Sequence, residues 1–322
     1  MGTIRIGGDP LWVECDPDGG FAISAIVDAA TGANALWQRT GFVPAEFRRV
    51  LGPSGEASIE SFVDLFVGGW FEMFPTTGYS GTVQGSTGPA VSLLHGEAMR
   101  LPWTITHRDA AAVEASVTMV RTPFRLTRRL DVIGDELLVT ERAENLAPTA
   151  APYVWGHHPC FSRAIFAGGR FEVDVVSAEV PAPVFDEAHN SLVPGAPFTF
   201  PEAPMLSGGM RDVAFIPEAP DGRHEQTTLL LRRGGVRITA PRIGRAFSLL
   251  WDEADFPHVL LWQDYQADGA AFWGRCDTFA VEPSSAPGRS LADAVAADAV
   301  QMLAPGASVS VTMRARWSAI GG

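Results

Sequence analysis

The sequence contains no lysine, because all 24 of its basic residues are arginine. This absence excludes mechanisms that need a lysine amine, such as those of Schiff-base aldolases and pyridoxal phosphate enzymes, and it excludes a phosphate-binding loop that depends on lysine. The 37 acidic residues give a net charge of −13 at pH 7. A protein of this charge repels nucleic acid and anionic lipid, so we expect neither as a partner.

Cysteine and long apolar runs are also scarce. Cys15, Cys160 and Cys276 lie far apart and form no Cys-x-x-Cys pair, which argues against both a disulfide framework and a thiolate zinc site. No run approaches the roughly 18 apolar residues of a membrane-spanning helix, and residues 1–20 carry acidic side chains without an apolar signal segment. We therefore expect a cytoplasmic protein with reduced thiols and no membrane partner.

The remaining composition is typical of an ordinary globular chain of 322 residues, with 46% hydrophobic and 19% charged residues. No linker or block of charge divides the sequence, so we expect a single domain that spans residues 1–322. The 33 glycines and 24 prolines leave little room for long helices.

Short runs that mix β-branched residues with alternating polarity recur along the chain and predict antiparallel strands. Residues 124–145 are typical of a hairpin with its turn at Gly134 and Asp135, and the Ala-rich segment 291–303 predicts the one convincing helix. These patterns predict an all-β protein, a large antiparallel sandwich with functional residues on a concave face or in rim loops. The other strands are expected at 22–28, 112–120, 171–180, 227–232, 236–239, 247–251, 259–263, 278–282 and 308–317.

Three places in the chain are candidates for acid–base chemistry. Neighbouring side chains on an extended segment point to opposite faces, so we expect only one of the adjacent residues His157 and His158 to face a cleft. His95 precedes Gly96, which permits a tight turn or a close backbone approach. Glu282 ends an apolar strand, where partial burial would raise the pKa of its carboxyl group toward that of a general base. Each residue taken alone is equally compatible with a structural role.

Two histidines and a glutamate could also bind a metal ion. The chain has no His-x-His, His-x-x-x-Glu or His-Glu-x-x-His spacing, and adjacent histidines on a strand cannot easily bind one ion, so we expect no metal. Several tryptophans, Trp262 among them, are candidates for stacking on the apolar face of a sugar ring, although core packing accounts equally well for most of them.

Taken in order, the segments resemble the aldose 1-epimerase (galactose mutarotase-like) family. GGFAISAIVDAATGANALW at 19–37 is similar to the opening segment of the family, and HG at 95–96 with PW at 102–103 is similar to its first histidine segment. Residues 136–161 resemble the strand, turn and second histidine segment, VEPSS at 281–285 the glutamate segment, and 303–317 the closing turn and strand. The resemblance covers most of the chain and implies a large β-supersandwich that interconverts the anomers of a cyclic sugar without a cofactor.

The resemblance also implies roles for three residues. Glu282 matches the base that removes the proton from the anomeric hydroxyl, His158 the acid that protonates the ring oxygen, and His95 the histidine that hydrogen-bonds near the ring oxygen. Opening a hemiacetal needs such an acid and base in any case, and each proton transfer contributes about 10² to 10⁴-fold. A neutral imidazole is a poor acid, so we expect a protonated His158 beside an ionised Glu282.

The residues that would bind the sugar depart from the family pattern. Residues 67–78 lack the arginine and asparagine of typical mutarotases, and we expect Trp70 and Glu72 to replace them. His157 stands where the family often has asparagine, and Asp212 loosely matches a substrate-binding aspartate. The full set expected to contact the substrate is Trp70, Glu72, Arg100, His157, Asp212, Trp262 and Gln263.

The leading hypothesis is an aldose 1-epimerase that acts on a small-molecule sugar as a monomer or homodimer, and three other functions remain open. A hexose-6-phosphate epimerase would need arginines around the phosphate, and Arg100, or Arg48 with Arg49, could serve. A non-catalytic carbohydrate-binding protein could use the same scaffold. A lyase or hydrolase acting on an oligosaccharide would need a long groove and a second acidic group.

Overall fold

The computed structural model of the chain describes residues 2–39, 62–63, 66–79, 81–85, 88–269, 272–287 and 291–321, with backbone only at 81–85 and 88–92. Arg48 and Arg49 lie outside the described residues. In the part of the chain that is described, no helix has the length and hydropathy needed to cross a bilayer.

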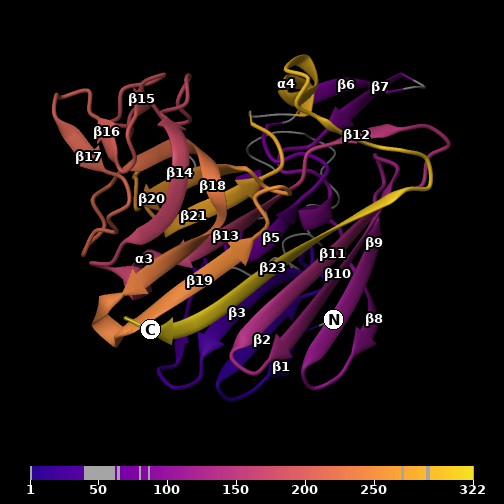
Figure 1. Cartoon of the computed structure of the whole chain (residues 1–322), viewed down its shortest axis with the longest axis horizontal. Helices are drawn as coiled ribbons and strands as arrows, with labels where there is room; N and C mark the ends of the chain where they lie inside the picture. The colour runs from indigo at the N-terminus through magenta and orange to yellow at the C-terminus, as the bar shows by residue number, and fades with distance from the viewer. Residues whose placement is uncertain are drawn as a thin grey trace.

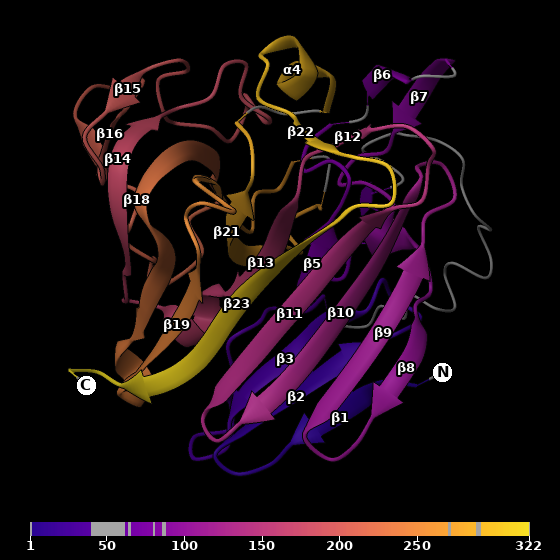
Figure 2. The same cartoon turned by 45° about the vertical axis from the view of Figure 1, so that its right-hand side comes forward.

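The described strands form mainly one 17-stranded antiparallel sheet (Figures 1 and 2). Its strands are β1 (Ile4–Gly7), β2 (Leu11–Asp16), β3 (Ala22–Asp28), β4 (Ala33–Asn34), β5 (Trp70–Met73), β8 (Thr104–Arg108), β9 (Ala112–Thr118), β10 (Phe124–Ile133), β11 (Glu136–Asn145), β13 (Gly156–Ser162), β14 (Phe171–Glu179), β15 (Pro197–Phe198), β18 (His224–Ala240), β19 (Arg245–Trp251), β20 (His258–Tyr265), β21 (Asp277–Ser284) and β23 (Ser308–Ala319).

Three small strand pairs and four short helical segments lie outside the large sheet. The pairs are β6 (Gly81–Gly85) with β7 (Gly88–Ser92), β12 (Ala151–Tyr153) with β22 (Gln301–Leu303), and β16 (Glu202–Pro204) with β17 (Met210–Asp212). The helical segments are η1 (Ala98–Arg100), α3 (Arg163–Phe166), η2 (Pro241–Ile243) and α4 (Leu291–Ala296).

Hydrogen-bonded neighbours connect the large sheet in a single path. It runs from β8 through β9, β10, β11, β23 and β19 to β18. From β18 it continues through β20, β21, β13, β5 and β3 to β2 and β1. β14 pairs with the free side of β18. The strand β18 belongs to both halves of the path because its first half pairs with β20 and its second half with β19.

The predicted hairpin at 124–145 is confirmed as β10 and β11, which join at Gly134 with φ of 63°. Two other predictions are wrong in part. The strands expected at 227–232 and 236–239 are one strand, β18, which continues through Gly234 and Gly235. The helix expected at 291–303 ends at Ala296, and its last three residues form β22, because pairing with β12 outweighs the helix propensity of alanine.

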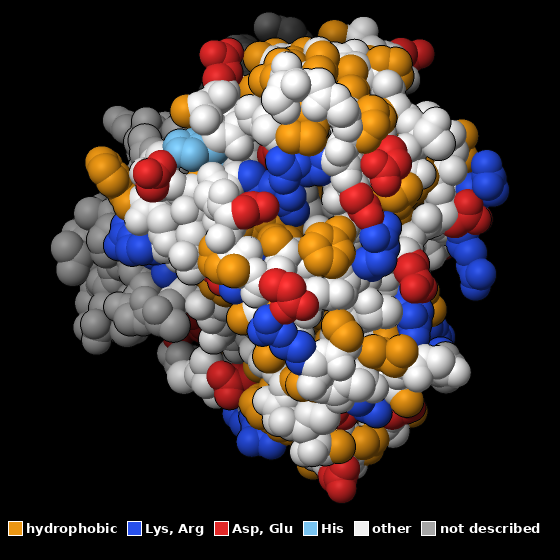
Figure 3. Space-filling view, turned by 90° about the vertical axis from the view of Figure 1, so that its left-hand side faces the viewer, with side chains coloured by type: hydrophobic (Ala, Val, Ile, Leu, Met, Phe, Trp, Pro, Cys, Tyr) orange, Lys and Arg blue, Asp and Glu red, His pale blue; other side chains and the backbone are white. Residues whose placement is uncertain are grey.

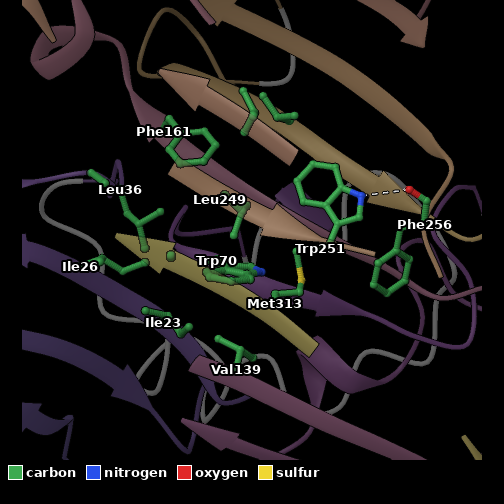
Figure 4. Close-up of a cluster of buried hydrophobic side chains, with 14 of the residues drawn as sticks. Ile23, Ile26, Leu36, Trp70, Val139, Phe161, Leu249, Trp251, Phe256 and Met313 are labelled. Atoms are coloured by element: carbon green, nitrogen blue, oxygen red, sulfur yellow. Dashed lines mark hydrogen bonds between the residues drawn. The ribbon is translucent and has the colours of Figure 1, made fainter. Parts of the chain in front are cut away.

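A cluster of buried hydrophobic side chains fills the interior of the sandwich. Figure 4 shows side chains from β3, β5, β11, β13, β19 and β23 within this cluster. Trp70 belongs to it and is 1% exposed. Trp251 also belongs to it, and its indole N–H donates to the carbonyl of Phe256 at 3.0 Å. Because each large apolar side chain buried in this way contributes about 1.5–3 kcal/mol, the core holds the strands that carry the site in fixed register.

Candidate functional site

A cavity of about 630 Å³ lies against the face of the sheet formed by β5, β13, β21, β20 and β18. Alternate side chains of a strand share one face, so the strand registers arrange the floor of this cavity in rows. In strand order the rows are Met73, Gly156, Ser284, His258 and Leu230; Phe71, His158, Glu282, Leu260 and Thr228; and Cys160, Ala280, Trp262 and Gln226. All of these except Gly156, Phe71, Cys160 and Ala280 line the cavity itself.

The register of β13 and β21 brings His158 and Glu282 together. Gly156 pairs with Ser284, and two residues further along each strand the same register places His158 opposite Glu282. Directly opposed side chains of antiparallel strands lie close enough for contact. Nε2 of His158 is 3.3 Å from Oε1 of Glu282, and both side chains line the cavity although they are only 4% exposed.

His95 reaches the same cavity from a separate turn. Its backbone has φ of 58°, and the following residue, Gly96, has φ of 77°. A Cβ at Gly96 would lie 2.1 Å from the carbonyl oxygen of Phe74, so this close backbone approach requires glycine. The ring centroids of His95 and His158 are 5.4 Å apart. The three residues predicted for acid–base chemistry therefore lie around one cavity.

The hydrogen bond of His95 fixes which of its ring nitrogens carries the proton. Nδ1 lies 2.7 Å from the carbonyl oxygen of Thr77, and because a carbonyl can only accept, Nδ1 is the donor. Burial lowers the pKa of His95 to about 4, so the ring is neutral at pH 7. Nε2 is then an acceptor, which suits a sugar hydroxyl and not a ring oxygen, since a ring oxygen has no proton to donate.

Burial opposes charge on both members of the pair. It raises the pKa of Glu282 well above its usual value, and burial followed by the nearby His95 lowers the pKa of His158 well below its own. Because each charged form loses its hydration, burial favours the neutral pair in the unliganded protein, and the expected protonated His158 beside an ionised Glu282 stays a prediction for the sugar-bound state. In the neutral pair the carboxyl group of Glu282 carries the transferable proton. Its transfer to Nε2 of His158 across the 3.3 Å contact produces the ionised pair.

Aromatic and sulfur groups hold the ring of His158 in place. Phe71 stacks on it with ring centroids 4.6 Å apart and planes inclined by 18°, and Trp262 packs edge-on at 5.5 Å. Sγ of Cys160 lies 3.1 Å from Nδ1 of His158. Burial raises the pKa of the Cys160 thiol well above its usual value, so the thiol stays protonated. These contacts orient Nε2 of His158 toward Glu282.

Comparisons with known proteins support the fold and leave the activity open. No protein-family model matches the chain, and no curated protein matches its sequence. Among solved structures, the Slr1438 protein of Synechocystis sp. PCC 6803 is similar with a TM-score of 0.72 and 16% identity, over 99% of this chain and 96% of that chain. A protein of Escherichia coli K12, provisionally named as an aldose 1-epimerase, has a TM-score of 0.69 and 15% identity over 99% of both chains. A galactose mutarotase-like protein of Lactobacillus casei has a TM-score of 0.65 and 16% identity, over 98% of this chain and 100% of that chain.

The chain has the galactose mutarotase-like fold. This agrees with the large antiparallel β-supersandwich implied by the resemblance of its sequence motifs. At these identities the similarity shows the fold alone, so the roles of individual residues depend on where this mutarotase-like structure places them.

Trp262 and Gln263 follow each other on β20 and therefore face opposite sides of the sheet. Trp262 lines the cavity, and its Nε1–H donates to Nε2 of His224 at 2.6 Å. Gln263 faces the core, where its amide donates to the carbonyl of Val213 at 3.0 Å and to the hydroxyl of Tyr265 at 3.2 Å. The expectation that Gln263 contacts the substrate is wrong because its side chain is on the other face.

Three further residues expected to contact the substrate lie on the core face of the mutarotase-like sheet. Trp70, Glu72 and His157 are each at most 1% exposed, and none lines the cavity; Figure 4 shows Trp70 among apolar side chains. The register of β5 and β13 pairs His157 with Glu72 on one face and His158 with Phe71 on the other. The expectation for all three is therefore wrong, whereas the prediction that His157 and His158 face opposite ways is confirmed.

A buried polar network surrounds His157. Nε1–H of Trp70 donates to Nδ1 of His157 at 3.3 Å, and Nε2 of His157 lies 3.1 Å from Glu141, which pairs with Nε of Arg128 at 2.8 Å. Ligand atoms of Glu72, Glu141 and His157 lie within 4.8 Å of one another, close enough to hold a metal ion. Because Trp70 already occupies Nδ1 and the Arg128 guanidinium would repel a cation, the set suits a buried ion pair and a shared proton better than a metal.

Neither Arg100 nor Asp212 is among the described residues that line the cavity, although Arg100 lies close enough to His95 for its charge to help lower the pKa of that ring. Arg100, in η1, donates to the carbonyl of Leu94 at 3.4 Å. Asp212, in β17, forms an ion pair with Arg170 and accepts the N–H of Ala214 at 3.0 Å. Figure 3 shows acidic and basic side chains interspersed on the side of the molecule that lies at the left of Figure 1. The expectation that Asp212 contacts the substrate is therefore wrong, because Asp212 is engaged with Arg170 and Ala214, whereas a contact between Arg100 and the substrate stays a prediction.

Sequence reasoning missed seven residues of the cavity floor: Met73 on β5, Ser284 on β21, His258 and Leu260 on β20, and Gln226, Thr228 and Leu230 on β18. A strand at 259–263 was predicted and Trp262 was named, so alternation from Trp262 points to Leu260 and His258. No comparable signal pointed to β18, because its pairing with β20 joins segments that are distant in sequence.

Proposed function

We propose that this protein is an aldose 1-epimerase, an isomerase that interconverts the α and β anomers of a free aldose. The observation that carries the proposal is the 3.3 Å contact between Nε2 of His158 and Oε1 of Glu282, at the floor of a cavity whose volume is typical of small-molecule sites. The names of proteins with a similar fold, an aldose 1-epimerase and a mutarotase-like protein, support it.

Ring opening removes a proton from the anomeric hydroxyl and adds one to the ring oxygen. Both oxygens are bonded to C1, so two groups in contact on adjacent strands can serve both. Glu282 as carboxylate takes the hydroxyl proton and His158 as imidazolium donates to the ring oxygen, while the C1–O5 bond breaks and the C1 carbonyl forms. After rotation about C1–C2, the reverse transfers close the ring with the opposite configuration. Protons balance within the pair, and no cofactor is required.

The neutral ring of His95 has a different role in this scheme. With Nδ1–H held by the carbonyl of Thr77, its Nε2 accepts a hydrogen bond from a sugar hydroxyl and so orients the ring above the pair. The ionised state of the pair forms when the proton of Glu282 passes to His158 as the polar sugar enters the cavity.

Two-dimensional exchange NMR on common aldoses tests the proposal. Wild-type protein should accelerate anomer exchange, and Glu282→Gln or His158→Gln should each reduce the rate by about 10² to 10⁴-fold. Glu172→Gln and His107→Gln are matched controls on exposed strand positions and should keep the wild-type rate. No acceleration by the wild type with any sugar would contradict the proposal. Quenching of tryptophan fluorescence by a sugar without exchange would instead favour a non-catalytic carbohydrate-binding protein.

An unphosphorylated sugar suits the site better than a hexose 6-phosphate. None of the described residues that line the cavity is arginine, which is the phosphate-binding side chain available to a protein without lysine. Inorganic phosphate should therefore not compete with the sugar, and competition would favour the phosphorylated substrate. The single domain, the cytoplasmic localisation and the monomeric or homodimeric state stay predictions.

A further inference from the structure

Leu260 interrupts the polar groups on the floor of the cavity. It is the cross-strand partner of Glu282 on one side and of Thr228 on the other. The middle row of the floor therefore reads His158, Glu282, Leu260 and Thr228. The side chain of Leu260 lines the cavity and is partly exposed to it, so it can contact whatever the cavity holds.

The chemistry proposed for the pair determines which part of the sugar lies over Leu260. The anomeric carbon C1 has three heavy-atom neighbours: the ring oxygen, the anomeric oxygen and C2. With the ring oxygen toward His158 and the anomeric oxygen on Glu282, C2 points away from His158. His158 and Leu260 are on opposite sides of Glu282, so C2 and its substituent lie toward Leu260.

The surroundings of Leu260 offer little to a hydroxyl at C2. The leucine side chain has no donor or acceptor. The hydroxyl of Thr228, on the far side, already contacts the carbonyl oxygen and a carboxylate oxygen of Glu179, each at 3.4 Å. Leu230 of the adjacent row adds a further apolar contact to the same wall. A hydroxyl placed directly over Leu260 loses water and gains no partner from that side chain. Apart from the proposed base, the nearest polar side chains of the described cavity floor are Thr228, across the strand pair, and His258, two residues earlier on β20.

We propose, on the basis of the epimerase function proposed above, that the site selects aldoses without a free hydroxyl at C2, such as 2-deoxyaldoses or aldoses with a 2-O-alkyl group. An apolar wall rejects an added hydroxyl by about tenfold to a hundredfold. The preference resides in Leu260, because it is the side chain directly beside the base.

The test compares D-glucose, 2-deoxy-D-glucose and 2-O-methyl-D-glucose by exchange NMR, with each catalysed kcat/KM divided by the uncatalysed rate of the same sugar. The wild type should favour 2-deoxy-D-glucose over D-glucose by about tenfold or more. Leu260→Gln, whose amide can pair with a hydroxyl, should abolish or reverse this ratio. Leu260→Met, an apolar side chain of similar volume, should retain it.

A wild-type ratio of one or less, or a ratio that Leu260→Gln leaves unchanged, would overturn the inference while leaving the epimerase function intact. If no sugar shows exchange, tryptophan fluorescence titration with the same sugars separates the two proposals. Tighter binding of 2-deoxy-D-glucose by the wild type, lost in Leu260→Gln, would keep the C2 inference and refute the epimerase. Equal or absent binding of all three sugars would refute both.

Discussion

Replacement of Gly96 by alanine should destabilise the protein by about 2–5 kcal/mol and displace His95, and the magnitude follows from two contributions. The left-handed backbone of Gly96, with φ of 77°, costs a residue with a Cβ about 1–2 kcal/mol. The added Cβ would also lie 2.1 Å from the carbonyl oxygen of Phe74 and 2.4 Å from its carbonyl carbon. Backbone atoms cannot swing aside as a flexible side chain can, so relief of this clash costs about 1–3 kcal/mol more.

Gly134→Ala provides a matched control for the first contribution. Gly134 also has a left-handed backbone, with φ of 63°, but a Cβ there meets no atom within 4 Å. Its replacement should cost about 1–2 kcal/mol. Urea unfolding of both variants and of the wild type measures the two losses, and their difference reports the clash alone.

Activity should respond to Gly96→Ala as well. The carbonyl of Phe74 also accepts the N–H groups of Glu97 at 2.9 Å and Ala98 at 3.3 Å, so movement of this carbonyl shifts the whole turn that carries His95. Anomer exchange should fall in Gly96→Ala and stay at the wild-type rate in Gly134→Ala. Equal destabilisation of the two variants would refute the reasoning, because it would mean that the close backbone approach imposes no cost.

Four other predictions follow from the charges and contacts of the described residues. Burial lowers the pKa of His158 and raises that of Glu282, so the pair keeps one proton across neutral pH. The rate of anomer exchange should therefore be flat from about pH 6 to pH 8. A pH–rate profile with its midpoint near 6.5, the ordinary pKa of histidine, would contradict this. Burial raises the pKa of Asp264 to about 7, so the folded state holds a proton that the unfolded chain releases near pH 4. The contribution of Asp264 to the free energy of unfolding is therefore fully present below about pH 4. It is lost as the pH rises to about 7, and the total loss is roughly 4 kcal/mol. Urea unfolding at about pH 5 and about pH 8 measures the free energy of unfolding of the wild type and of Asp264→Asn. The variant should lack the loss between the two pH values, and the same pH dependence in both proteins would argue against a protonated Asp264. Arg128→Met should cost about 3–5 kcal/mol because it removes the charged partner of the buried Glu141 carboxylate and leaves only the neutral ring of His157 beside it. A loss below about 1 kcal/mol in the same assay would be inconsistent with the buried pair. Asp212→Asn should keep the exchange rate within about twofold of wild type, since such surface changes are usually small, and a larger loss would place Asp212 at the site after all.

The sequence predicted those features of the fold that depend on local periodicity. Alternating polarity identified the hairpin of β10 and β11, and the observed burial along β11 alternates in the same way. It failed where long-range pairing outweighs local preference. Residues 301–303 continue an Ala-rich segment, yet they form β22 because β12 offers a strand partner.

The same distinction between local periodicity and long-range pairing applies to the candidate site. Alternation predicted that His157 and His158 face opposite sides, but it did not identify the side that holds the cavity. The partner of His158 is Glu282, and this pairing follows from the register of β13 with β21, which joins segments distant in sequence. The place of Trp70 and Glu72 in a motif predicts that they contact the substrate. A place in a motif does not specify which face of a strand a side chain occupies, and the register puts both on the core side.

The two faces of β13 explain why a buried polar network lies directly behind the candidate site. A shift of one residue in the pairing of a strand moves every side chain to the other face, and here it would exchange His157 for His158 in the cavity. The shift would also move Phe161 out of the core, which opposes it, but hydrophobicity does not distinguish the two histidines themselves, because their side chains are chemically identical. The N–H of Trp70 and the carboxylate of Glu141 contact the two ring nitrogens of His157, and only one register satisfies these contacts. The network behind the sheet, together with the burial of Phe161, therefore specifies which histidine meets Glu282, and the loss expected for Arg128→Met reflects the stability of that register as well as of one ion pair.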